Sequence, residues 1–228
     1  MKGKIVLVTG ANGGLGTHVT QAFLAAGATV IGTSRKIRQS DFAHANFVAV
    51  AGEISTCEGV KILLDQVTRR CDRLDVLAHT VGGFAGGSPL AETNDATFQQ
   101  MVDVNLNATF YLLRAAIPVL RKSGNARIVA IGSRAALEPG ANVGAYSASK
   151  AAMVSLIETV AAENQDVGMT ANVILPGMMD TPANRQAMPN ADFSKWVDPA
   201  TVASLMVWLA SVAGKNVNGA VIPVYGTT

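Results

Sequence analysis

Cysteine, charge and long apolar runs are all scarce in this sequence of 228 residues. Its two cysteines, Cys57 and Cys71, are too few for a disulfide framework or a cysteine-rich metal site, and free thiols are typical of a reducing cytoplasm. Only 15% of the residues are charged, and 18 basic against 16 acidic residues leave a net charge of +2. That balance argues against a protein that binds nucleic acid through charge.

The apolar runs are too short for a signal peptide or a membrane span. The run near the N-terminus covers only residues 5–8, whereas a signal-peptide core needs roughly 7–15 apolar residues. The longest run, 202–213, contains Ser204 and Ser211 and falls short of the roughly 20 residues that a spanning helix needs. We therefore expect a cytoplasmic protein that makes no membrane contact.

Short β-branched apolar runs alternate with helical patterns along the whole chain, as is typical of a parallel sheet with crossover helices. We expect strands near 4–9, 28–34, 46–50, 74–79, 126–132, 170–175 and 219–224, and helices near 14–26, 56–70, 95–121, 144–165 and 199–213. The sequence thus predicts one α/β domain over residues 1–228, a Rossmann-type doubly wound sheet of about seven strands with helices on both faces. Two irregular segments, 82–88 and 177–197, follow strand ends, where such sheets bind ligands.

A glycine-rich turn joins the first strand to the first helix, where residues 9–16 read TGANGGLG. Glycine lets the backbone turn sharply and approach a diphosphate, and the helix N-terminus supplies free N–H groups. The pattern predicts a nucleotide site, and a tight turn without a ligand is the alternative. The residues expected to hold the nucleotide are Gly10, Asn12, Gly13, Gly14, Leu15 and Gly16.

The end of the second strand bears on the choice of nucleotide. A carboxylate there would bind the ribose 2′-hydroxyl and repel a 2′-phosphate, but this chain has Ser34 followed by Arg35, Lys36 and Arg38. Guanidinium and ammonium groups suit a phosphate, so the sequence favours NADP(H), with NAD(H) as the alternative. A solvated basic loop is the simpler explanation of the same charges.

Tyr146 and Lys150 lie at i and i+4 of a predicted helix and so share one face. An ammonium beside the phenol would favour the phenolate and lower the tyrosine pKa, which suits acid–base catalysis. On its own such a pair is also common on exposed helices. Here Ser133 ends a predicted strand thirteen residues before Tyr146, and Asn105 lies within the preceding long helix.

The glycine turn, Asn105, Ser133 and the Tyr146-x-x-x-Lys150 pair together resemble the short-chain dehydrogenase/reductase family. Chain length, motif order and the Pro176-Gly177 pair extend this resemblance over essentially the whole sequence. It implies an NAD(P)-dependent oxidoreductase in which Tyr146 donates the proton, Lys150 holds the nicotinamide ribose and Ser133 binds the reacting group. It also implies that Asn105 supports a helix kink and a proton path, and that the protein forms a homodimer or homotetramer.

The resemblance adds cofactor contacts and also reveals a departure. The further cofactor-binding residues that it implies are Glu53, Ile54, Gly82, Gly83, Pro176, Gly177 and Thr181. Where the family usually has Asn-Asn-Ala-Gly, however, this chain has His79-Thr80-Val81-Gly82, which leaves the bracing of the central sheet in question. We expect His79 to be a hydrogen-bonded structural residue, and we assign no metal because His18 and His44 lack ligand spacing.

Segments 81–87 and 175–196 are similar to those of the dihydropteridine reductase branch of the family. This similarity implies a dihydropteridine acceptor that stacks on Phe84, with further substrate contacts from Met178, Met179, Asn184 and Met188. The methionines have flexible apolar packing as an equal alternative role. Because Ser133 and Asn105 are typical of ordinary carbonyl reductases, a ketone or a 3-oxoacyl thioester is the alternative small-molecule substrate. A non-catalytic NADP(H)-sensing regulator is the alternative from another class.

Overall fold

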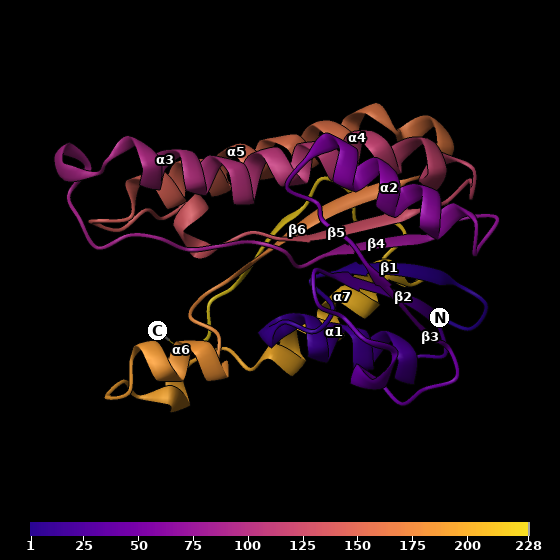
Figure 1. Ribbon diagram of the computed structural model, residues 1–228, viewed down its shortest axis with the longest axis horizontal. Helices are drawn as coiled ribbons and strands as arrows, with labels where there is room; N and C mark the ends of the chain where they lie inside the picture. Colours follow the sequence, from indigo (N-terminus) through magenta and orange to yellow (C-terminus); the bar gives the residue numbers. More distant parts are fainter. Residues whose placement is uncertain (228) are drawn as a thin grey trace.

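A parallel sheet organises the residues that the computed structural model describes, 1–227 (Figure 1). Its strand order is β3-β2-β1-β4-β5-β6-β7, so the direction of winding reverses between β1 and β4. The prediction of a doubly wound sheet of seven strands is therefore confirmed. The strands are β1 (Ile5–Thr9), β2 (Thr29–Ser34), β3 (Phe47–Ala51), β4 (Val76–His79), β5 (Arg127–Ile131), β6 (Thr170–Pro176) and β7 (Val221–Val224).

Helices cover both faces of the sheet, as Figure 1 shows. One layer contains α2 (Cys57–Thr68), α4 (Ala108–Arg121) and α5 (Gly144–Glu163), and the other contains α1 (Gly14–Ala25) and α7 (Pro199–Ala210). Alternate side chains of each strand enter different cores: Leu7 of β1 packs under the first layer, whereas Val6 and Val8 pack under the second. Burial on both faces explains why the strands are continuous apolar runs.

The long helix expected over 95–121 is interrupted. It consists of α3 (Asp95–Met101), a π-helical turn (Val102–Asn107) and α4. A π-helical turn holds one extra residue per turn and is frequent at functional sites. Asn105, which the sequence placed inside a helix, lies within this turn.

Segment 177–197 is more regular than the sequence suggested. It contains α6 (Pro182–Ala187), which Thr181 caps through its hydroxyl and in which Pro182 takes the first position. The segment closes on itself, because Asp180 N donates to Val197 O at 2.9 Å and Val197 N donates to Met178 O at 2.8 Å. Figure 1 shows α6 to one side of the two helical layers. The single-turn 3-10 helices cover Gln39–Asp41, Leu90–Glu92, Arg134–Ala136, Gln165–Val167 and Phe193–Lys195.

Candidate active site

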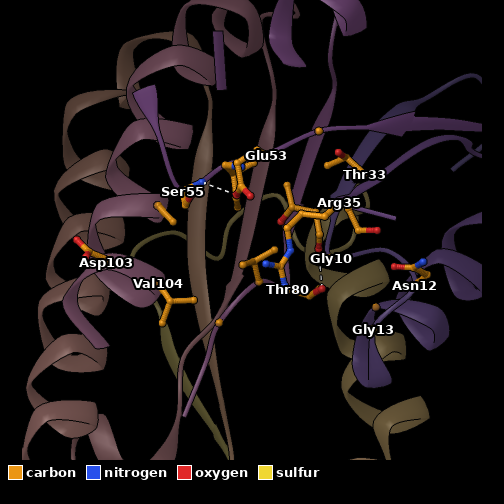
Figure 2. A pocket seen from close by; sticks show the side chains of 18 of the residues that line it. Gly10, Asn12, Gly13, Thr33, Arg35, Glu53, Ser55, Thr80, Asp103 and Val104 are labelled. Atoms are coloured by element: carbon orange, nitrogen blue, oxygen red, sulfur yellow. Dashed lines mark hydrogen bonds between the residues drawn. The ribbon is translucent and has the colours of Figure 1, made fainter. Parts of the chain in front are cut away.

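A cavity of about 830 Å³ opens at the carboxyl ends of β1, β2, β3 and β4 (Figure 2). This is the point where the strand order reverses, and open α/β sheets bind their ligands there. Eleven of the residues predicted to hold the nucleotide line it. They are Gly10, Asn12, Gly13, Gly14, Leu15, Gly16, Ser34, Arg35, Glu53, Ile54 and Gly82.

The glycine turn has the shape that a phosphate requires. Gly10 has φ +70°, a left-handed conformation that favours glycine, and a Cβ atom on Gly16 would overlap the Gly10 carbonyl oxygen. Gly13 is the N-cap of α1 and no side chain caps this end of the helix. The first N–H groups of α1 therefore remain free to bind an anion beside the cavity.

The end of β2 places unpartnered polar groups and a cation at the cavity wall. The buried hydroxyl oxygens of Thr33 and Ser34 have no hydrogen-bond partner among the described residues, and both residues line the cavity. Arg35 points into it, with Glu53 nearby (Figure 2). Two buried, unsatisfied hydroxyls beside a free cradle of N–H groups fit a polar ligand such as a nucleotide.

Glu53 is held as a carboxylate. Its Oε1 accepts hydrogen bonds from Ile54 N at 2.8 Å and Ser55 N at 2.9 Å. The bond from the Ser55 backbone is the main cause of a lowered Glu53 pKa, and the charge of Arg35 adds to it.

The opposite wall was not predicted. Gln99, Gln100, Asp103 and Val104 line the cavity from α3 and the π-helical turn, and Figure 2 shows Asp103 and Val104 across from Asn12. No motif marks these residues in the sequence, and which side chains of the π-helical turn face the cavity depends on where its extra residue falls. Thr80 was also missed, and its hydroxyl donates to Thr9 O at 2.7 Å.

Tyr146, Ser133 and Lys150 come together beyond this cavity, at the carboxyl end of β5. The side chains of Tyr146 and Ser133 share a hydrogen bond that lowers the Tyr146 pKa, but burial raises that pKa more, so the phenol is protonated at neutral pH. Lys150 is buried and donates from Nζ to Ile131 O at 3.1 Å, not to Tyr146. The expectation that Lys150 lowers the Tyr146 pKa is therefore not met in the protein alone. Burial lowers the Lys150 pKa to about 8.

Asn105 is hydrogen-bonded to the loop after β4. Its Oδ1 accepts from Gly83 N, and its Nδ2 donates to Gly83 O, both at 3.0 Å. Nδ2 also donates to Ser149 Oγ of α5 at 3.1 Å. A Cβ atom on Gly82 would lie 2.8 Å from Lys150 Nζ and 3.1 Å from Asn105 Oδ1, so Gly82 passes closely between these two groups.

The expected substrate contacts divide into two groups. Phe84 is 66% exposed and meets the Tyr146 ring edge-on, with centroids 5.0 Å apart at 79°. Met178, Met179, Asn184 and Met188 belong to the α6 segment and do not line the cavity; Asn184 Nδ2 donates to Met179 O at 2.8 Å.

The expected cofactor contact Thr181 packs on Gly14, where an added Cβ atom would lie 3.1 Å from Thr181 Cγ2. The other expected cofactor contacts, Pro176 and Gly177, continue β6, and Gly177 N donates to Val224 O at 2.9 Å.

His79 is hydrogen-bonded within the protein through both ring nitrogens, as predicted. It is buried, and its ring bonds the hydroxyls of Thr9 at 2.8 Å and Thr109 at 3.0 Å. Burial, with the nearby charge of Lys150, lowers its pKa to about 3, so the ring is neutral. Within residues 1–227 no three histidine, cysteine or acidic side chains lie together as a metal site would need. Nor do the described helices include one long and apolar enough to cross a bilayer.

The glycine turn, the cavity beside it and the Tyr146–Lys150 pair on α5 together define a Rossmann-type NAD(P)-dependent oxidoreductase. Residues 4–192 match the family model described as short chain dehydrogenase. The chain therefore belongs to the short-chain dehydrogenase family, which confirms the resemblance found in the sequence.

Curated relatives have several different activities. An uncharacterized oxidoreductase of Escherichia coli, YciK, is 33% identical over 220 residues, which cover 90% of this chain and 85% of the relative. Dihydropteridine reductase of Dictyostelium discoideum is 29% identical over 223 residues, covering 96% and 93%. The 3-oxoacyl-[acyl-carrier-protein] reductase FabG of Vibrio harveyi is 26% identical over 238 residues, covering 99% and 97%.

Solved structures share the fold over nearly the whole chain. The Pseudomonas aeruginosa RhlG/NADP complex has a TM-score of 0.91 at 27% identity, covering 99% of this chain and 96% of that one. A 3-ketoacyl-(acyl-carrier-protein) reductase from Brucella melitensis, complexed with NADH, has a TM-score of 0.88 at 22% identity, covering 99% and 98%. Structures with this fold thus include complexes with either nucleotide.

Proposed function

We propose that the protein reduces a small organic acceptor with NAD(P)H and that Tyr146 donates the proton. The observation that carries this proposal is a protonated, half-buried phenol hydrogen-bonded to Ser133 beside a nucleotide-sized cavity. The nicotinamide would supply the hydride when bound. A regulator that only sensed the nucleotide would have no use for such an acid.

Each polar residue near Tyr146 has a separate task in this proposal. Tyr146 holds the proton on its hydroxyl, and Ser133 hydrogen-bonds the acceptor atom where negative charge develops. Lys150 carries a positive charge at neutral pH, because its lowered pKa of about 8 still lies above 7. That charge favours the tyrosinate once Tyr146 has given up its proton.

We further propose that the favoured nucleotide is NADP(H). Arg35 points into the cavity, and the unpartnered hydroxyl of Ser34 lies beside it. A guanidinium and a hydroxyl can both donate to a 2′-phosphate. Glu53 lies close to Arg35, but its Oε1 is committed to two backbone N–H groups.

The acceptor that we favour is a dihydropteridine. Phe84 presents an exposed aromatic face next to Tyr146, on which a planar ring could stack. The similarity to dihydropteridine reductase of Dictyostelium over 96% of the chain supports the same class. A 3-oxoacyl thioester is the second candidate, favoured by the hydrogen bond between Ser133 and Tyr146 and by the similarity to FabG.

The decisive experiment combines one substitution with two acceptors. Initial rates of NADPH and NADH oxidation are measured with a quinonoid dihydropterin and with a 3-oxoacyl thioester. We expect Tyr146→Phe to abolish turnover while NADPH fluorescence still reports binding. Tyr111→Phe on α4, outside the site, is the matched control and should keep wild-type rates. Near-normal turnover in Tyr146→Phe would exclude Tyr146 as the proton donor.

The remaining expectations concern the whole molecule. We propose that residues 1–228 form one nucleotide-binding domain, with 177–197 as the segment on the substrate side. Its two free cysteines, one of them exposed, fit a cytoplasmic location. We also propose a homodimer or homotetramer, because α4 and α5 leave small side chains at least partly exposed where a partner helix could approach closely. These are Ala115, Ala151, Ala152 and Ala162.

A further inference from the structure

A chain of hydrogen bonds runs through the protein interior from β1 to the π-helical turn. Thr9 ends β1 and pairs in register with His79 at the end of β4. The His79 ring contacts Thr9 Oγ1 through Nδ1 at 2.8 Å and Thr109 Oγ1 through Nε2 at 3.0 Å. Thr109 Oγ1 donates in turn to the backbone carbonyl of Asn105 at 2.7 Å.

The available donors and acceptors allow these hydrogen bonds to be donated in only one direction, from Thr9 towards Asn105. Thr109 has a single hydroxyl proton, which it gives to the Asn105 carbonyl, so it accepts from His79. The proton on the His79 ring is therefore on Nε2, and Nδ1 accepts from the Thr9 hydroxyl. All four groups are at least 99% buried, so water does not replace a lost partner cheaply.

The two residues at the ends of this chain of hydrogen bonds, Thr9 and Asn105, both belong to the proposed active site. Thr9 immediately precedes Gly10 of the nucleotide turn. Asn105 holds both backbone polar groups of Gly83 and the hydroxyl of Ser149, one residue before Lys150. A displacement of Asn105 would therefore move the loop after β4 relative to α5.

We propose that His79, as the neutral Nε2–H tautomer, is a positioning residue that fixes Asn105 and the Gly82–Gly83 loop relative to the nucleotide turn. It acts through Thr109 and touches no reacting atom. This proposal rests on the proposed function, because the family resemblance assigns Asn105 to the proton path and Gly82 and Gly83 to cofactor binding. A low His79 pKa, caused by burial and by the charge of Lys150, keeps the required tautomer uncharged over the physiological pH range.

The first test reads the tautomer and needs no substrate. Long-range proton–nitrogen NMR correlations of the three histidines distinguish Nε2–H from Nδ1–H, and His79→Asn assigns the signal. We expect a neutral Nε2–H ring at position 79 that does not titrate between about pH 5.5 and 8.5, well above its lowered pKa. An Nδ1–H tautomer, or a ring that titrates in this range, would refute the proposal whatever the enzyme reduces.

The second test separates positioning from simple support of the sheet. Thr109→Val removes both bonds of the threonine hydroxyl, Thr109→Ser keeps them, and His44→Asn on an exposed loop is the matched control. We expect Thr109→Val to lower kcat about tenfold or more, with the KM for NADPH nearly unchanged, and to speed amide exchange at Gly83; Thr109→Ser restores both. A lower melting temperature with unchanged kcat and unchanged Gly83 exchange would mean that the histidine only braces the sheet.

Should Tyr146→Phe keep turnover, the proposed function fails, whereas the tautomer and the Gly83 exchange still decide the positioning proposal. If Thr109→Val does not fold, Thr9→Val removes the hydrogen bond to His79 at the other end of the hydrogen-bond chain. That variant is expected to reproduce the loss of kcat, and a wild-type kcat would overturn the proposal.

Discussion

The buried lysine of the site is expected to make the protein less stable than a chain that lacks it. Lys150 is 4% exposed, and burial lowers its pKa from 10.5 to about 8. Each pKa unit corresponds to about 1.4 kcal/mol, so holding the ammonium in the interior costs about 3 kcal/mol at pH 7. Lys150→Met removes that cost and also the bond to Ile131 O, which contributes about 1 kcal/mol. The variant should therefore be about 2 kcal/mol more stable at pH 7.

The difference should depend on pH in a defined direction. Below pH 8 the lysine is charged in both the folded and the unfolded chain, so the full cost is present. Between pH 8 and 10.5 the folded protein loses this proton first, which makes the wild type more stable as the pH rises. The advantage of Lys150→Met should accordingly shrink to nearly zero by about pH 10.

Urea unfolding at pH 7, 8, 9 and 10 tests this reasoning. Lys61→Met, at an exposed position of α2, is the matched control and should show no such pH dependence. The reasoning is refuted if Lys150→Met is less stable than the wild type at pH 7, or if the difference stays constant from pH 7 to 10. NADPH-dependent turnover should be lost in Lys150→Met throughout.

Four further predictions concern the nucleotide, the turn, the acceptor and the oligomeric state. Arg35→Ala should weaken NADPH binding by about 1–3 kcal/mol and leave NADH binding nearly unchanged, as titrations of both nucleotides would show. Arg38 does not line the cavity, so Arg38→Ala is the control. Equal weakening of the binding of both nucleotides by Arg35→Ala would mean that Arg35 does not recognise the 2′-phosphate. Gly16→Ala should abolish nucleotide binding because its Cβ atom overlaps the Gly10 carbonyl oxygen, whereas Gly140→Ala, with open space around it, should bind normally. Phe84→Ala should raise the KM for a planar aromatic acceptor several-fold with little effect on nucleotide affinity, and an unchanged KM would argue against stacking. Light scattering at micromolar concentration tests the oligomer, and a monomer would contradict it.

The sheet was predictable because its strands carry their signal locally. A run such as residues 5–8 is apolar at every position, which is what burial on two faces demands, and the strand limits agree to within two residues. The residues alone did not predict the π-helical turn, because the extra residue is stabilised by contacts distant in sequence, such as that of Asn105 with Gly83. Only the family resemblance, which implied a helix kink at Asn105, indicated an interruption there.

The residues of the site likewise fall into those with a local sequence signal and those placed by contacts distant in sequence. The glycine turn and Arg35 lie next to strand ends, so their place at the cavity follows from the strand order alone. Asp103 and Val104 line the cavity from the π-helical turn itself, so their place depends on where the helix changes its winding. α6 was not located although Thr181 and Pro182 form a recognisable helix start, because its six residues, Pro182–Ala187, are too few to show a helical period.

The backbone bonds that join the two ends of segment 177–197 set this segment apart from the rest of the fold. Met179 and Val197 form a parallel bridge, so the chain leaves the body of the protein and returns to it at one point. Apart from Thr181, which packs on Gly14 of the nucleotide turn, the residues between these positions can change without altering the path of β6 or the start of α7. If this segment lies on the substrate side, as proposed, a change of acceptor would require substitutions in this excursion and would leave the glycine turn as it is.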